Sequence, residues 1–228
     1  GAELGGGGGE QADTSMETST EPAATGTLTA TVNFEGEAPE PETYDASGND
    51  ECGVDTVEGQ KVVVNDNGTL KNVVVAVKSG PDGLDKSPGD VQFTQKNCQY
   101  KPHVAVAKTG QSVKVGDEDP QLHNVRGTQD GNQLFNLQTF KGQSKEFSVD
   151  NAGVVSLECD VHPWMQGYLY VTDNGAAGVT GENGEVTLEE LPEGDYTLEI
   201  WHEEYGTQTK DVTISEDEES SVSVTFSA

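Results

Sequence analysis

Residues 153–165 read GVVSLECDVHPWM, an apolar run typical of a buried strand followed directly by a Cys-x2-His-x2-Met pattern. Cys159, His162 and Met165 are three metal-ligating side chain types within seven residues, in a chain of 228 residues with only 4 His and 2 Met. A tight loop after a strand can turn all three side chains toward one point. A fourth ligand must then come from elsewhere in the chain.

His123, on an earlier predicted strand 36 residues before Cys159, supplies this fourth ligand. Thiolate and thioether ligands favour copper, and a His2Cys set with a weak axial Met is the arrangement of blue-copper electron-transfer sites. Zinc sites normally use four Cys or His ligands, or keep an open position for water. The pattern therefore predicts one type 1 copper per chain and disfavours zinc.

The rest of the folded chain reads as all-β. Residues 27–34 alternate apolar and polar side chains, as a half-buried strand does, and Gly, Asp, Asn and Pro turns separate further short apolar segments. The other predicted strands are 61–65, 69–78, 103–108, 111–115, 121–126, 144–149, 153–159, 167–172, 184–189, 195–201, 207–214 and 220–227. This spacing predicts a β-sandwich with a second, smaller strand set after it.

Composition divides the chain into three predicted parts. Residues 1–25 contain the glycine run 5–9 and a Ser/Thr/Glu/Pro-rich stretch, so we expect a disordered linker, either a lipid or membrane tether or a terminus without a function. Residues 26–172 form the first predicted domain. Residues 173–228 form a smaller β-sandwich module, whose limited core should pack against the first domain.

The charge of the chain restricts its partners. It has 12 Lys+Arg against 41 Asp+Glu, a formal charge of -29, which argues against an electrostatically driven nucleic-acid binder. The excess of acidic residues either keeps the protein soluble or attracts a basic partner. No apolar run approaches the roughly 18 residues of a transmembrane segment.

Residues 26–172 resemble the cupredoxins: the segment at His123 is similar to that of plastocyanins, and the loop from Cys159 to Met165 is similar to that of amicyanins. The resemblance implies a Greek-key β-sandwich in which copper is ligated by His123, Cys159, His162 and Met165. It implies that Asn124 helps to hold the two ligand loops together and that electrons leave through His162 near the surface.

The same resemblance suggests a surface for a redox partner. Pro163 and Trp164 would give the exit at His162 an apolar rim, although burial of Trp164 against the second module is an alternative. Cupredoxins often have Ser or Thr after the ligand Cys, whereas this chain has Asp160, so the resemblance does not extend to that outer hydrogen bond.

The C-terminal part resembles transthyretin-like and carboxypeptidase-regulatory-like β-sandwich modules. The similarity lies in residues 180–188, TGENGEVTL, and 191–198, LPEGDYTL. It implies a structural or docking role for this module rather than catalysis.

With Cys159 assigned to copper, Cys52 and Cys98 are left to form a disulfide, and two separate buried thiols are the alternative. A disulfide indicates an oxidising, extracytoplasmic compartment such as the periplasm or the cell surface. His103 and His202 have no assigned role; a second metal site would require them to lie close together beside Glu203 or Glu204.

These observations predict a non-enzymatic electron-transfer protein that shuttles one electron between Cu(I) and Cu(II) with redox partner proteins, basic ones or a cytochrome. The alternative is an extracytoplasmic copper-binding or delivery protein, which the lack of Met-rich or His-rich tracts disfavours. Copper nitrite reductases commonly hold a catalytic copper with three further His. Only two His remain here beyond the predicted centre.

Overall fold

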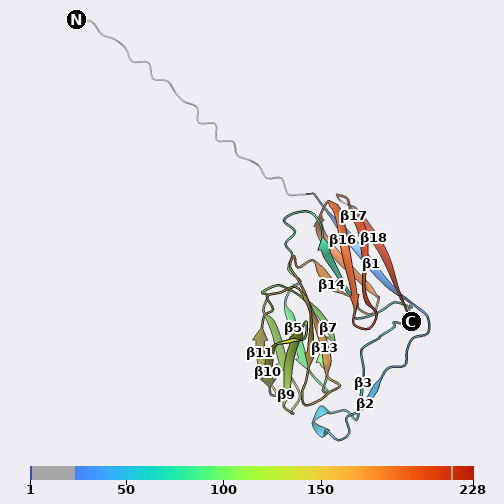
Figure 1. Cartoon of the computed structure of the whole chain (residues 1–228), viewed down its shortest axis with the longest axis vertical. Coiled ribbons are helices and arrows are strands. Elements are labelled where there is room, and N and C mark those ends of the chain that lie inside the picture. The colour runs from blue at the N-terminus through green and yellow to red at the C-terminus, as the bar shows by residue number, and fades with distance from the viewer. Residues whose placement is uncertain (2–23, 217) are drawn as a thin grey trace.

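The computed structural model describes residues 1, 24–216 and 218–228, which form two β-sandwiches (Figure 1). The predicted linker, residues 1–25, lies almost entirely outside the described residues. Within the described part, the only helical segment is the 3-10 turn η1 (Asp50–Cys52). No helix in that part is long and apolar enough to cross a membrane. The all-β prediction is confirmed.

The central sandwich comprises residues 91–172 and two facing sheets. One sheet has the strand order β10-β9-β12-β13-β7, and the other has the order β11-β8-β5-β6. The strand bounds are β5 (Val91–Gln95), β6 (Tyr100–Lys101), β7 (Val104–Lys108), β8 (Val113–Asp117), β9 (His123–Gln129), β10 (Asn132–Thr139), β11 (Ser144–Phe147), β12 (Gly153–Glu158) and β13 (Gln166–Thr172). Their inward side chains make one continuous core that includes Phe93, Val115, Leu157 and Leu169.

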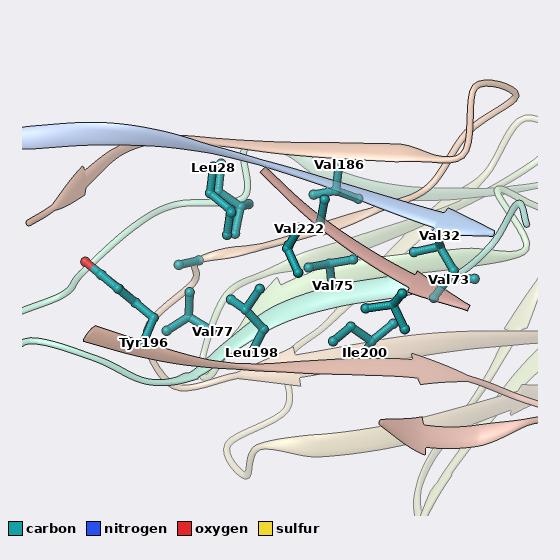
Figure 2. Packing of buried hydrophobic residues seen from close by; sticks show 14 of the residues in the cluster. Leu28, Val32, Val73, Val75, Val77, Val186, Tyr196, Leu198, Ile200 and Val222 are labelled. Atoms are coloured by element: carbon teal, nitrogen blue, oxygen red, sulfur yellow. The ribbon is translucent and has the colours of Figure 1, made fainter. Parts of the chain in front are cut away.

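The terminal sandwich comprises residues 25–79 and 177–227. Its sheets have the orders β15-β1-β18 and β14-β4-β16-β17. Its strand bounds are β1 (Thr25–Glu35), β4 (Val74–Ser79), β14 (Ala177–Val179), β15 (Glu185–Pro192), β16 (Gly194–His202), β17 (Gly206–Ile214) and β18 (Glu219–Ser227). The alternation predicted for residues 27–34 is present, because every second side chain of β1 is buried in the core that Figure 2 shows.

The strands group differently from the predicted boundary between residues 172 and 173. β1 lies between β15 and β18, antiparallel to the first and parallel to the second, and β4 pairs with β14 and β16. Residues 25–79 therefore complete the C-terminal module, and residues 91–172 are inserted between its two halves. Alternation predicts which face of a strand is buried but not which strand it pairs with, and this is why the boundary was misplaced.

A long excursion between β1 and β4, residues 36–60, which we call the cap, contains β2 (Thr43–Asp45), η1 and β3 (Thr56–Glu58). The strand predicted at 61–65 makes only an isolated bridge at Val64. Three strands of the central sandwich, β5, β6 and β10, were not predicted. β5 and β10 were missed because their sequences are rich in Gln, Asn and Thr, and β6 is only two residues long.

The two sandwiches contact each other through the outer faces of two sheets. Val74 and Ala76 of β4 pack against Val104 of β7 and Tyr170 of β13. The Tyr168 ring lies edge-on to Trp201 with ring centroids 5.3 Å apart. This contact covers an apolar face of the sheet that carries the predicted ligands.

Candidate metal centre

The predicted ligands meet at one end of the five-stranded sheet. His123 is the first residue of β9, Cys159 directly follows β12, and Met165 directly precedes β13. β12 pairs with both neighbours, and the final β12–β13 pair is Glu158 with Gln166. Because neighbouring antiparallel strands begin and end at the same edge, this register places the three residues side by side although up to 42 residues separate them in sequence.

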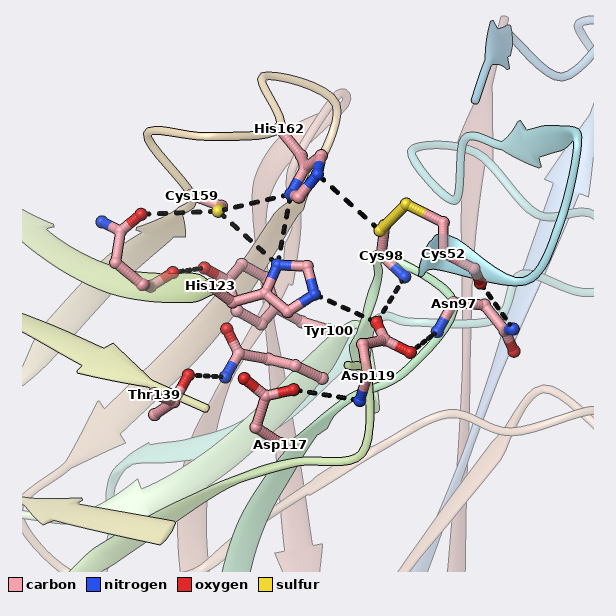
Figure 3. A network of polar contacts seen from close by, with 12 residues as sticks. Cys52, Asn97, Cys98, Tyr100, Asp117, Asp119, His123, Thr139, Cys159 and His162 are labelled. Atoms are coloured by element: carbon pink, nitrogen blue, oxygen red, sulfur yellow. Dashed lines mark hydrogen bonds and ion pairs between the residues drawn. A yellow bond between two sulfur atoms is a disulfide. The ribbon is translucent and has the colours of Figure 1, made fainter. Parts of the chain in front are cut away.

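Three donor atoms converge in this centre (Figure 3). The Sγ of Cys159 lies 3.9 Å from the Nδ1 of His123 and 3.9 Å from the Nδ1 of His162. The two Nδ1 atoms are 3.2 Å apart. Two imidazole nitrogens and one thiol facing a common point form the donor set that copper proteins use, so the residues fit that metal.

The ligand loop is closed by its own backbone. The N–H of Met165 donates to the carbonyl of His162 at 2.9 Å, and the N–H of Cys159 donates to the carbonyl of Met165 at 3.3 Å. The Met165 side chain is 1% exposed and belongs to the same core cluster as Cys159. A short hydrogen-bonded loop between two paired strands holds its side chains with little freedom to move.

The two histidines have opposite charge preferences. Burial lowers the pKa of His123, but its hydrogen bonds to Asp119 and Cys159, together with the negative charges of Asp117 and Cys159, outweigh burial and raise it to about 9. Burial and the positive charge of His123 lower the pKa of His162 to about 4. Burial alone would raise the pKa of the Cys159 thiol, but hydrogen bonds from His123 and from backbone N–H groups hold it below its ordinary value. The metal-free centre thus places a protonated imidazole at His123 beside a neutral one at His162.

Asp119 is a functional residue that the sequence reasoning missed. Its carboxylate accepts a hydrogen bond from the Nε2 of His123 at 3.1 Å and from the backbone N–H groups of Asn97 and Cys98, both at 2.8 Å. A carboxylate on the distal nitrogen of a ligating histidine sets the tautomer and ring orientation. The available signal was a carboxylate four residues before a predicted ligand histidine.

Asn124 and Asp160 connect the two ligand segments. The side-chain oxygen of Asn124 accepts from the N–H of Asp160 at 2.8 Å and faces the Sγ of Cys159 at 3.4 Å. The Asn124 amide donates in return to the Asp160 carboxylate at 2.9 Å, and Arg126 makes an ion pair with the same carboxylate at 2.9 Å. Asn124 thus joins the strand of His123 to the residue that follows Cys159.

His162 does not lie at the surface, which corrects the expectation of an exposed electron exit. Its side chain is 1% exposed, and the cap contributes Cys52, whose Sγ lies within 4.8 Å of its ring nitrogen. The Sγ of Cys98 lies 3.9 Å from the Nε2 of His162, and the Trp164 ring lies beside it with ring centroids 5.3 Å apart. Trp164 stacks on Tyr44 of the cap rather than on the terminal sandwich, and Pro163 is exposed beside it.

A disulfide between Cys52 and Cys98 attaches the cap to the central sandwich. The side-chain amide of Asn97 donates to the carbonyl of Cys52 at 3.0 Å, and that of Gln99 donates to the carbonyl of Glu58 at 2.9 Å. Both half-cystines are buried, and the bonded sulfurs face the metal centre.

His103 and His202 do not form a second metal site. The Nε2 of His103 pairs with the carboxylate of Glu203, and its Nδ1 donates to the carbonyl of Gln166 at 3.1 Å. His202 accepts at its Nδ1 from the backbone N–H groups of Glu204 and Tyr205. Among the described residues, no cluster of three ligating side chains includes either histidine.

No protein-family model matches this sequence. Comparison with curated protein sequences finds no match either.

Three solved structures are similar to part of this chain. The copper-containing nitrite reductase of Thermus scotoductus is 18% identical over 36% of this chain and 22% of that chain, with a TM-score of 0.34. The purple cupredoxin of Nitrosopumilus maritimus is 24% identical over 36% of this chain and 100% of that chain, with a TM-score of 0.34. Amicyanin from Paracoccus versutus is 20% identical over 43% of this chain and 97% of that chain, again at 0.34. These similarities span less than half of the chain, so the donor atoms of this chain carry the assignment of a metal centre.

Proposed function

We propose that this chain is a one-electron carrier that holds one copper ion in a type 1 centre through His123, Cys159, His162 and Met165. The observation that carries the proposal is the convergence of one thiol and two imidazole Nδ1 atoms in a buried site. A copper ion bound by this donor set supplies a Cu(II)/Cu(I) couple.

The protein's own contribution is to keep the ligands in place and dry. His123 and Cys159 are 0% and 4% exposed, so water has little access to the centre. Asp119 orients His123, and the hydrogen bonds of Asn124 tie the strand of His123 to the Cys159 loop. Ligands held this rigidly rearrange little when the charge of the centre changes, which favours rapid electron transfer.

The same burial favours a carrier over a copper-delivery protein, because a delivery site has to offer its ligands to a partner. An additional catalytic copper is also disfavoured. Two of the four histidines occupy the centre, His103 pairs with Glu203, and His202 binds backbone N–H groups.

The charge around the centre supports a basic redox partner. Residues 91–172 contain seven of the 12 basic residues and eight of the 41 acidic ones, so the central sandwich is nearly neutral. The cap, residues 36–60, contains eight exposed acidic residues and no Lys or Arg, and it covers His162. A partner with a basic face, such as a cytochrome, would therefore be attracted to the metal end. We place the protein outside the cytoplasm, since it contains a disulfide.

Visible absorption and EPR spectra after addition of one equivalent of Cu(II) test the proposal. We expect an intense thiolate-to-copper charge-transfer band in the wild type and its complete loss in Cys159→Ala, because the thiolate is the only source of that transition. Val161→Ala, an exposed position in the same loop, should keep the band. Weak d–d absorption alone in the wild type would rule out the centre.

A second prediction concerns the pH dependence of copper binding. Because the pKa of His123 is about 9 in the metal-free protein, its proton must leave when copper binds. This proton alone should make the affinity rise about tenfold per pH unit up to about pH 9, where the increase ends. Competition with a chelator of known affinity at several pH values measures the profile.

Two variants test the cause of this profile. Asp119→Asn removes the carboxylate that raises the pKa of His123, so the pH at which the copper affinity stops rising should be lower. Asp130→Asn removes an equal charge from an exposed turn and should leave the profile unchanged. A wild-type affinity that levels off below about pH 7 would contradict the predicted imidazolium.

A further inference from the structure

His162 presents its two ring nitrogens to two different groups of sulfur. Its Nδ1 faces Cys159, whereas its Nε2 faces the Sγ of Cys98, each at 3.9 Å. The donor atoms of Cys52, Cys98 and His162 all lie within 4.8 Å of one another. Figure 3 shows the disulfide on the far side of the His162 ring from Cys159.

We propose that reduction of the Cys52–Cys98 disulfide creates a second metal site, selective for Cu(I), from the two freed thiolates and the Nε2 of His162. The site goes beyond the proposed electron-transfer centre, because neither Cys52 nor Cys98 belongs to that centre. It exists only in the reduced protein, since the sulfurs of a disulfide are not thiolate ligands.

The reaction balances with a dithiol as reductant. The dithiol transfers two electrons and two protons to the disulfide, becomes a disulfide itself, and leaves two thiols at Cys52 and Cys98. Binding of Cu(I) then displaces the two thiol protons, and the metal ion does not change its oxidation state.

The surroundings suit a soft monovalent cation. Cys52, Cys98 and His162 are 1%, 0% and 1% exposed, so the three donors lie in a dry pocket. Thiolates select Cu(I) over harder ions, and burial disfavours the additional water ligands that those ions retain. The eight exposed acidic residues of the cap attract cations to the same end of the molecule. Copper capture at this end would then depend on the thiol redox state.

The experiment uses the full chain with Cys159→Ala, which removes the thiolate of the first centre. Cu(I) affinity is measured anaerobically by competition with a chromogenic Cu(I) chelator, before and after treatment with a dithiol that is then removed. We expect the reduced form to bind about one equivalent of Cu(I) at least tenfold more tightly than the disulfide form. Equal affinity of the two forms would overturn the proposal.

Two further variants, each also carrying Cys159→Ala, assign the ligands. Cys98→Ser leaves only the Cys52 thiol at this site, so its Cu(I) affinity should not rise on treatment with the dithiol. Circular dichroism shows whether this variant is folded. His162→Gln keeps the disulfide and both thiols, and should weaken binding in the reduced form; unchanged affinity would exclude His162 as a ligand. Wild type treated with the same dithiol should bind more Cu(I) than the untreated wild type. This comparison needs no variant, and the Cu(II) spectrum of the untreated wild type tests the first centre independently.

Discussion

Deletion of residues 173–228 is expected to abolish folding of residues 25–79, although the predicted first domain, 26–172, would be complete. β1 would lose both of its partners, β15 and β18, and β4 would lose β14 and β16. Fully buried side chains such as Leu28 and Val32 would face water, at a cost of about 1.5–3 kcal/mol each. The truncated chain should aggregate or bind a hydrophobic dye.

A shorter fragment is the matched comparison. Residues 88–173 keep every hydrogen-bonded strand pair of the central sandwich, so this fragment should unfold cooperatively. Circular dichroism and thermal unfolding of both fragments beside the full chain measure the difference. If the chain ending at residue 172 melted in one transition at the temperature of the full protein, β1 and β4 would not depend on the C-terminal strands.

Removal of the disulfide should cause the second large loss of stability. Cys52 and Cys98 are 46 residues apart, and closing a loop of that length restricts the unfolded chain by about 4 kcal/mol in the chain-entropy treatment. Cys52→Ser should therefore lower the free energy of unfolding by up to about 4 kcal/mol. The loss is smaller if the unfolded chain is already compact around this loop.

Guanidinium unfolding of the metal-free protein, with and without a dithiol, measures this effect. Cys159→Ala should respond to the dithiol as the wild type does, because Cys159 is the free cysteine. Cys52→Ser should show no response. An equal response in Cys52→Ser would mean that the reductant acts elsewhere than on this disulfide.

The predicted ligands could be found from the sequence because three of them lie within one short loop. A Cys-x2-His-x2-Met pattern at the end of an apolar strand depends on local spacing alone. Asp119 and the cap could not be found in this way. A spacing of four residues does not by itself show that the Asp119 carboxylate meets His123, because the turn before β9 brings them together, and the cap reaches His162 from residues 36–60.

The sequence itself determined the all-β class, the strand of residues 27–34 and the set of candidate metal ligands, since alternation and short-range spacing act within a few residues. The tertiary structure decided that β1 lies beside β18, where Thr27 faces Glu219, and that Cys98 covers His162 from 64 residues away. Such long-range pairs depend on how separate apolar faces fill one core. Many strands share the same pattern of buried side chains, so only the packed structure selects their partners.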